Sequence, residues 1–545
     1  MNIRDLLLRR RMMMDWGSPF PPPSDMLHTP MTFEAIEDGT GVYFSSYREG
    51  DIDLPVIEFS LDDGGTWEKQ SATEAIHDEG TGEYDYGEPL AVLNVGDKVR
   101  FRCENYKTYE ENSTDDNYAF INNYLFCSKP SYVYGNIMSI VAGENYVEAK
   151  NLGDANLYML FAHDIDGAVP VDYYVTHPTN DIILPATELN EDGYSNMFWK
   201  CNGLTRAPEL PATTLTGWCY AHMFLSCSNL TTPPELPALT LSEGCYEGMF
   251  AESGLTTAPE LLATELAEGC YYGMFSRCKS LTTAPILRAR HLANRCYSTM
   301  FAECTALVNP PELPAITIAG NCYSGMFDGC SNLLSAPELP ATTLAESCYS
   351  AMFRGCSKIS ELPVLPATIL ADSCYASMFN SCSSVVNTPN NYLPATNLAP
   401  NCYSGMFAKT GLINAPALPA THIEKNCYRE MFEGCAELLV APGLPATELA
   451  EACYYRMFNG CTSLTTTPRL EAQSLVNMCY SEMFKDCTSL ASVVCLAENA
   501  YQSSVNTARW LRNVSPSGTF TKKAGARWLM DTEDGIPAGW TVVEV

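Results

Sequence analysis

One arrangement of apolar positions recurs along most of the chain. The dipeptide Met-Phe stands at twelve places from Met197 to Phe484, and successive copies are 26 residues apart except for two steps of 25 and one of 28. A full unit reads CYSGMFDGCSNLLSAPELPATTLAES, starting at Cys322. A fixed period of this size is typical of proteins in which each repeat buries its apolar face against its neighbours, so the pattern predicts a stacked solenoid.

Each unit divides into a predicted helix and a predicted strand. In C-Y-x-x-M-F-x-x-C, Cys322, Met326 and Cys330 are spaced i, i+4 and i+8, and Tyr323 and Phe327 form the adjoining stripe, as on a helix of about two turns. The following L-T-T-A-P-E-L suits a short strand that its proline ends. Stacking is then expected to align one strand per unit into a parallel sheet.

The regions outside the repeats have different patterns. Over 31–130, segments such as VGDKVRFRC, in which Val99, Phe101 and Cys103 alternate with basic residues, predict an antiparallel, immunoglobulin-like β-sandwich. A degenerate copy around Tyr158 and the loss of the Cys-Tyr pattern near the C-terminus predict caps over 131–190 and 491–545, with the repeats over 191–490. The expected fold class is mixed α/β, a solenoid of about 12 units of ~26 residues preceded by a β-sandwich.

Two units depart from the pattern in the same way. Ser253 and Thr410 replace the second cysteine, and in both units the stretch that leads to the next leucine is one residue shorter. This correlation indicates that the cysteine fits one particular turn, so packing explains its presence without any chemistry.

The chain has 24 cysteines, and all but Cys103, Cys127 and Cys495 occupy the two repeat positions. Residues eight apart on a helix are separated by about 12 Å, beyond the roughly 7 Å limit between the Cα atoms of a disulfide. Buried free thiols are the favoured interpretation because cysteine packs well as a small apolar side chain. Disulfides or metal binding between units remain the alternative, although no C-x-x-C zinc spacing occurs.

Charge narrows the possible partners. The chain has 64 acidic and 32 basic residues, and its formal charge of −32 repels nucleic acid and anionic membranes. No stretch approaches the ~20 apolar residues of a membrane span. After Arg9, Arg10 and Arg11 only three methionines precede Asp15, whereas an export signal needs roughly 7–15 apolar residues. We therefore expect neither nucleic-acid binding, nor membrane insertion, nor export by the usual signal.

Few residues are candidates for catalysis or for binding a metal or cofactor. The seven histidines fall at different offsets within the units, and no phosphate loop, nucleophile elbow or metal motif occurs, so we expect no catalytic site, metal or cofactor. Ser60, Asp62, Gly64, Thr66 and Trp67 match the Asp-box motif, which closes hairpin turns. A row of acids follows the strand proline, and it is either a solvated edge or a cation-binding ladder. These acids are Glu209, Glu235, Glu260, Glu312 and Glu338.

The unit CYxxMFxGCxSLTTAPELPATTLA is similar to the BspA-like leucine-rich repeats of gut Bacteroidota and their phages, over about residues 180–490. The segment VYGNIMS from Val133 and the terminal G-I-P-x-G-W also resemble proteins of this group. The resemblance implies adhesion to a host-surface protein or glycan. We expect a structural protein of the phage virion, fibre-like or decorative, and the alternative is a bacterial cell-surface adhesin, whose export signal is missing here.

Two sets of contact residues are expected. Residues 1–30 form a basic arm that is either a disordered tail or, as we favour, a peptide that docks onto other virion proteins. Its proposed contacts are Arg4, Arg9, Arg10, Arg11 and Met12. Repeats keep the scaffold constant and vary the displayed face, so ligand contacts are expected at variable strand positions and on the insertion in the 28-residue step. These candidates are Arg206, Thr232, Asn309, Glu361, Asn390, Asn391, Tyr392 and Asn414.

Overall fold

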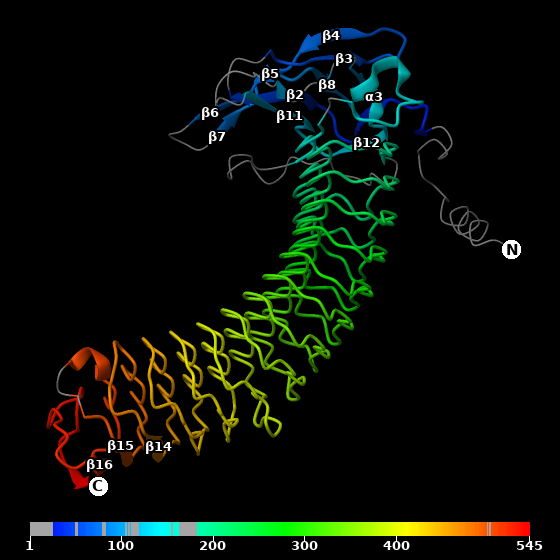
Figure 1. The fold of residues 1–545 in the computed structure, drawn as a ribbon. Coiled ribbons are helices and arrows are strands. Elements are labelled where there is room, and N and C mark those ends of the chain that lie inside the picture. The colour runs from blue at the N-terminus through cyan, green and yellow to red at the C-terminus, as the bar shows by residue number, and fades with distance from the viewer. Residues whose placement is uncertain are drawn as a thin grey trace.

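The computed structural model describes residues 26–49, 53–78, 83–103, 106, 109–110, 119–153, 156–162, 182–498, 500 and 503–545. A β domain stands at one end of a long, curved array of stacked coils, and the C-terminus lies at the other end (Figure 1). The array is a repeat solenoid, as predicted. The arm contacts Arg4, Arg9, Arg10, Arg11 and Met12 lie outside the described residues.

The β domain contains mixed sheets. Its strands are β1 (Met31–Ala35), β2 (Thr40–Glu49), β3 (Val56–Ser60), β4 (Glu68–Ser71), β5 (Thr73–Glu74), β6 (Ile76–Asp78), β7 (Glu83–Asp85), β8 (Ala91–Leu93), β9 (Lys98–Arg102), β10 (Tyr109–Glu110), β11 (Ala119–Cys127), β12 (Ser131–Asn136) and β13 (Ile182–Ile183). One sheet has the order β13-β12-β1-β9-β3-β4 and another β10-β11-β2-β5, with β8 also on β2, while β6 pairs with β7. Pairing is antiparallel except for β12 with β13 and β2 with β5. The short helix α3 (Met138–Ala142) and the 3-10 turn η1 (Gly143–Asn145) follow β12.

The core of the β domain is continuous with that of the array. Val99, Phe101 and Cys103 are buried, so the predicted alternation along β9 is confirmed. Phe33 lies 5.4 Å from Phe101 between ring centroids and 6.4 Å from Phe161. Phe161 belongs to the degenerate repeat copy, and the β domain therefore covers the first coil of the solenoid.

The predicted helix in each unit is wrong. Over residues 182–498, which are described without a gap, C-Y-x-x-M-F-x-x-C forms consecutive turns and no α-helix. In the unit that starts at Cys322, φ is 53° at Asn321, 60° at Gly325 and 75° at Gly329, and the other units repeat this spacing. A left-handed residue at every fourth position is incompatible with a right-handed helix. Four-residue turns and helices both bring positions i and i+4 to one side, which is why the spacing fitted either.

Backbone hydrogen bonds alternate along these turns. The amide of Met326 donates to the carbonyl of Tyr323 within the same unit at 3.2 Å. The next amide, that of Phe327, donates to the carbonyl of Met352 in the following unit at 2.9 Å. Every second amide of the turn segment thus ties one coil to the next along the long axis.

The inward side chains form continuous stacks. Tyr323 lies 5.8 Å from Tyr349, and Phe327 lies 5.7 Å from Phe353, with nearly parallel rings. The same tyrosine and phenylalanine stacks run through all twelve units, and Met326 is fully buried. The predicted burial of the Cys, Tyr, Met and Phe positions is therefore confirmed, although a different backbone produces it.

The predicted strand in every unit also needs correction. At this position the units before β14 form only three isolated parallel bridges, as between Thr257 and Thr283. Proline follows the position in every unit except the last, and proline cannot donate a ladder hydrogen bond. A regular parallel sheet forms only towards the C-terminus. Its strands are β14 (Thr466–Leu470), β15 (Ser492–Cys495), β16 (Gly518–Lys522) and β17 (Trp540–Glu544), in that order.

The C-terminal segment covers the last stacked rings. Trp510, which follows the 3-10 turn η3 (Ser504–Thr507), is fully buried. Its ring centroid lies 6.2 Å from that of Tyr480 and 5.3 Å from that of Trp528, and its indole N–H donates to the carbonyl of Gly535 at 2.9 Å. The aromatic stack thus ends beneath an aromatic cover.

A glycine explains the two shortened units. A Cβ atom on Gly254 would lie 2.2 Å from the carbonyl oxygen of Ser228, and one on Gly411 would lie 2.5 Å from that of Ser383. The chain passes so close to the preceding unit that one residue can be omitted there. The hydroxyl of Thr410, in place of the usual thiol, lies 3.3 Å from the sulfur of Cys435.

Replacing Gly254 with alanine is expected to destabilise the array by about 1–3 kcal/mol, because the backbone must move away from the carbonyl of Ser228. Thermal unfolding of the full chain measures the effect. Gly443→Ala is the matched control, because a Cβ atom there would meet nothing within 4 Å and the backbone is not left-handed. Equal melting temperatures for the two variants would contradict this explanation of the shortened unit.

Candidate binding surface

The variable strand candidates lie in one line along the array. Arg206 and Thr232 form a parallel bridge, and Asn309, Glu361 and Asn414 occupy the equivalent position in later units. Arg206 is half-buried and the other four are exposed. The structure therefore brings residues that are more than 200 positions apart in sequence onto one outward row.

The insertion in the 28-residue step is only partly a surface feature. Asn390 and Asn391 are exposed, and Asn391 has a left-handed backbone with φ of 53°. Tyr392, by contrast, is 3% exposed, and its ring centroid lies 6.2 Å from that of Phe407. The expectation that Tyr392 offers a contact surface is therefore wrong, because its ring anchors the insertion in the core.

An exposed apolar row, which the sequence analysis missed, runs beside the variable row. Its side chains are between 37% and 53% exposed. Their backbones are joined from unit to unit, as by the amide of Leu334 to the carbonyl of Val308 at 3.1 Å. The signal was available, because the position after the buried leucine, isoleucine or valine holds threonine in the first four units and an aliphatic residue in five of the next six, with Ser360 as the exception. The row consists of Val308, Leu334, Val386, Ile413 and Leu439.

The acidic row is exposed, and it is interrupted once. Glu209, Glu235, Glu260, Glu312 and Glu338 are all at the surface, and Ile286 takes the equivalent position between Glu260 and Glu312. Among the described residues no group of three or more His, Cys, Asp or Glu side chains is arranged to hold a metal ion. The cation-binding interpretation of this row gains no support from the geometry.

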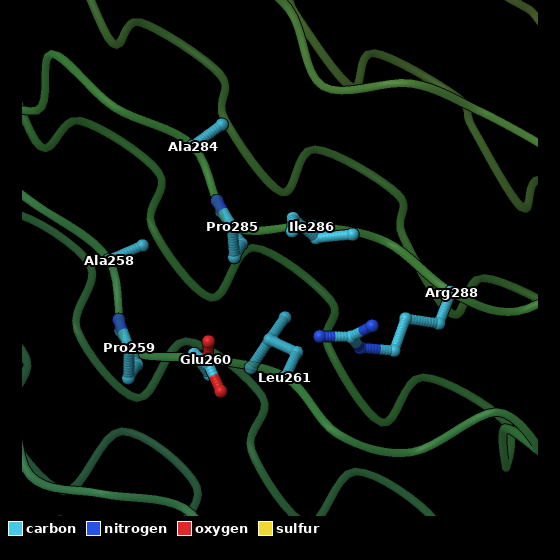
Figure 2. Close-up of a pocket in the computed structure, with 8 residues that line it drawn as sticks. All are labelled: Ala258, Pro259, Glu260, Leu261, Ala284, Pro285, Ile286 and Arg288. Carbon is cyan, nitrogen blue, oxygen red and sulfur yellow. The ribbon is translucent and has the colours of Figure 1, made fainter.

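A shallow hollow of about 180 Å³ lies where the acidic row is interrupted (Figure 2). It spans the coils of Met249 and Met274, and its walls include Pro259, Glu260 and Leu261 from the first coil and Pro285, Ile286 and Arg288 from the second. The side chain of Arg288 extends towards Leu261 and Glu260 across the hollow. The site thus combines apolar walls with one carboxylate and one guanidinium group.

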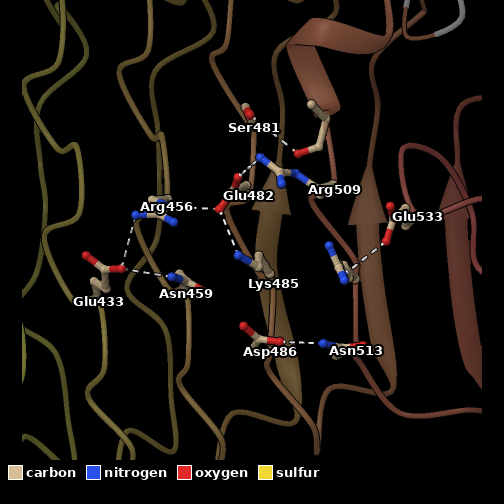
Figure 3. A network of polar contacts seen from close by, with 12 residues as sticks. Glu433, Arg456, Asn459, Ser481, Glu482, Lys485, Asp486, Arg509, Asn513 and Glu533 are labelled. Carbon is tan, nitrogen blue, oxygen red and sulfur yellow. Dashed lines mark hydrogen bonds and ion pairs between the residues drawn. The ribbon is translucent and has the colours of Figure 1, made fainter.

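A separate polar network joins the last coils around one buried carboxylate (Figure 3). Glu482 is 2% exposed and accepts hydrogen bonds from Arg456 at 2.9 Å, from Lys485 at 3.1 Å, and from Arg509. Burial by itself would raise the pKa of Glu482, but the hydrogen bonds from Arg456 and Lys485 outweigh it and lower this pKa. All the charged partners belong to the protein, so the network serves to hold coils together.

The Asp-box residues close a turn of the β domain. Asp62 accepts hydrogen bonds from the backbone amide of Thr66 at 2.7 Å, from the hydroxyl of Ser60 at 2.8 Å and from the hydroxyl of Thr66 at 2.8 Å. These bonds lower the pKa of Asp62 to about 2. The carboxylate of Asp62 is therefore hydrogen-bonded within the turn, in agreement with the predicted structural role.

The cysteines are all buried, as the sequence predicted, and all carry free thiols. Each of the ten at the second repeat position donates its S–H to the carbonyl of a phenylalanine in the preceding coil, as Cys330 does to Phe301 at 3.0 Å. Burial raises the pKa of Cys219 to about 11 and that of Cys330 to about 12. The thiols are thus neutral, hydrogen-bonded core groups.

We expect few or none of the 24 thiols to react with a thiol reagent such as Ellman's reagent at pH 8 in the native chain. The thiolate is the reacting form, and burial both suppresses it and blocks access. After denaturation in guanidinium chloride under otherwise equal conditions, all of the thiols should react. Rapid modification of several cysteines in the folded chain would contradict the structure.

The described residues contain no helix long and apolar enough to cross a membrane. Comparison with family models, with curated proteins and with solved structures finds no match to this chain.

Proposed function

We propose that this chain is a non-catalytic adhesin that binds a host-surface protein or glycan through the outward face of its solenoid. The proposal rests on a contrast between the inward and the outward positions of the repeats. The inward Met-Phe pair is identical in all twelve units. The outward row holds threonine in three consecutive units from Thr232 but varies elsewhere in size, polarity and charge, as at Arg206, Glu361 and Val440. A constant interior with a varied exterior is the property expected of a scaffold that displays contacts.

We further propose that the repeats belong to the leucine-rich class. In support, the 25- to 28-residue spacing lies in the range of that class, and the leucine after each turn segment, such as Leu281 or Leu333, is fully buried. The resemblance of the unit to BspA-like repeats supports the same assignment. The turn segment takes the place that a helix has in many leucine-rich repeats.

The proposed location is the phage virion, with the basic arm docked onto other virion proteins. Support comes from the resemblance to repeats found in phages, and from the contrast between Arg4, Arg9, Arg10 and Arg11 and the acidic remainder of the chain. Opposite charge favours docking of such an arm on an acidic partner surface.

Two measurements test the proposal. Mass spectrometry of purified particles from the phage that encodes the chain should recover its peptides at a constant ratio to the capsid proteins, and their absence from intact particles would remove the virion location. Recovery from the surface of uninfected cells would instead support the bacterial adhesin. Separately, the labelled full chain should bind intact host cells saturably, and a lack of saturable binding would contradict adhesion.

A further inference from the structure

The coil that contains Met274 differs from the others along its outward face. Where most units read L-P-A-T, this one reads L-R-A-R from Leu287. Leu287 and Ala289 are buried while Ile286, Arg288 and Arg290 are exposed, so these three side chains project from the same side of an extended segment. The replacements therefore add two guanidinium groups next to the hollow without altering the inward positions.

The side chains of Arg288 and Arg290 have no partner among the residues that the structure describes. In the part of the chain that the structure describes, every other arginine side chain takes part in an ion pair, a hydrogen bond or a contact with an aromatic ring or another group. Arg288 and Arg290 make none of these contacts, although the chain carries twice as many acids as bases. Two adjacent unpaired arginines on an acidic molecule are available for an anion from outside.

The surroundings limit that anion to a single charge. Glu260 and Glu312 stand in the acidic row on either side of Ile286, one coil away in each direction. A polyanion laid along the array would meet both carboxylates. A ligand with one negative group can place that group at Arg288 and Arg290 and its uncharged part beside Glu260, which lines the same hollow. A guanidinium group is suited to a carboxylate because it can donate two parallel hydrogen bonds to it.

We infer that this hollow binds a sugar residue that carries one carboxylate. The apolar walls formed by Pro259, Leu261 and Ile286 suit the C–H face of a sugar ring, and the hollow of about 180 Å³ offers a place for one such ring. A peptide with a single acidic side chain would extend beyond the hollow over Glu312, while a compact sugar stays within the hollow. The inference rests on the proposed binding function of the array and adds the class of ligand.

The test uses the full chain, with methyl β-glucuronide as the probe and methyl β-glucoside as its uncharged counterpart. Titration calorimetry or ligand-observed NMR should show binding of the glucuronide that is weakened roughly tenfold or more in Arg288→Pro/Arg290→Thr. This double variant restores the residues common at these positions in the other units, so its melting temperature should be unchanged. Equal affinity of the variant for the glucuronide, or equal affinity of the native chain for the two sugars, would overturn the inference.

A matched control removes the same charge elsewhere. Lys279→Ser/Lys358→Ser also takes away two exposed cations and introduces serine, which is common at the equivalent positions in other units. This variant should bind the glucuronide as the native chain does. A loss equal to that of the arginine variant would show a general charge effect and overturn the site.

The site can also be transplanted. Ala336, Pro337, Glu338 and Leu339 repeat the residues of Ala258 to Leu261, and the next coil already has Val364 where Ile286 stands. The lining residue Ala284 corresponds to Leu362 in that coil and must be matched as well. Leu362→Ala/Val364→Ile/Pro366→Arg/Thr368→Arg should therefore create a second site and double the binding stoichiometry, and an unchanged stoichiometry would count against the proposed residues.

Further results distinguish a sugar ligand from a peptide ligand, and the binding site from the adhesive function. A blocked Ala-Glu-Ala peptide that binds as tightly as the glucuronide would overturn the assignment to a sugar. Saturable binding to host cells without any binding of the glucuronide would overturn this inference alone. Glucuronide binding without attachment to cells would support the site and contradict only the adhesive function.

Discussion

Replacing Phe327 with alanine is expected to cost about 3–5 kcal/mol and to divide the thermal unfolding of the array into two transitions. The ring is fully buried and lies 5.7 Å from both Phe301 and Phe353. Its loss leaves a cavity between coils that are otherwise joined by backbone hydrogen bonds and the tyrosine stack, so the halves on either side become less strongly coupled. Scanning calorimetry of the full chain measures both effects.

The control for this substitution is Val364→Ala in the next coil. Val364 is 74% exposed, and the change should alter stability by less than about 0.5 kcal/mol and leave the shape of the transition intact. If Phe327→Ala gave a single transition at the native temperature, the aromatic stack would not be what couples the coils.

The second large effect is expected at Glu482. Glu482→Gln keeps the shape of the side chain but leaves Arg456, Lys485 and Arg509 around a neutral amide at a site that is 2% exposed. Removing one partner of such a buried pair should cost about 3 kcal/mol at pH 7. Hydrogen exchange should locate the loss in the last coils. Protection unchanged there would show that the network does not hold them together.

The loss of stability caused by Glu482→Gln should become smaller as the pH falls. The pKa of Glu482 is lowered in the folded chain. Its carboxylate therefore stabilises the fold fully at pH values above the pKa of glutamate in the unfolded chain, ~4.3. This stabilisation disappears as the pH falls through the pKa of the folded chain. The native chain and Glu482→Gln should therefore converge in stability in acid. As a surface control, Glu303→Gln breaks a pair with Arg277 that is about half exposed on both sides, and it should cost less than about 1 kcal/mol.

The sequence identified which residues face inward but not the path of the backbone. Burial of Tyr323, Met326 and Phe327 follows from their spacing, and a period of four positions satisfies either a helix or a series of turns. A distinguishing signal was present at Gly325 and Gly329, since glycine recurring four residues apart disfavours a helix and suits a left-handed backbone. The strand prediction gave too little weight to the proline that follows the bridge position in every unit but the last.

The candidate surface was predictable only in part. The variable row from Arg206 to Asn414 could be read from the repeat register, but the burial of Tyr392 depends on how the insertion folds back against Phe407. The replacement of proline and threonine by Arg288 and Arg290 was visible in the sequence. That their side chains have no partner in the described part of the chain could be established only from the positions of the surrounding acids.

The hydrogen bonds between coils also determine how the array responds to tension. They run along the long axis, so a pull on the two ends puts the same force on every coil-to-coil contact in series, and the contacts are expected to break one at a time. Each coil that detaches releases 26 residues, or roughly 90 Å of extended chain. The array should lengthen in discrete steps and so limit the force that reaches whatever is attached at either end.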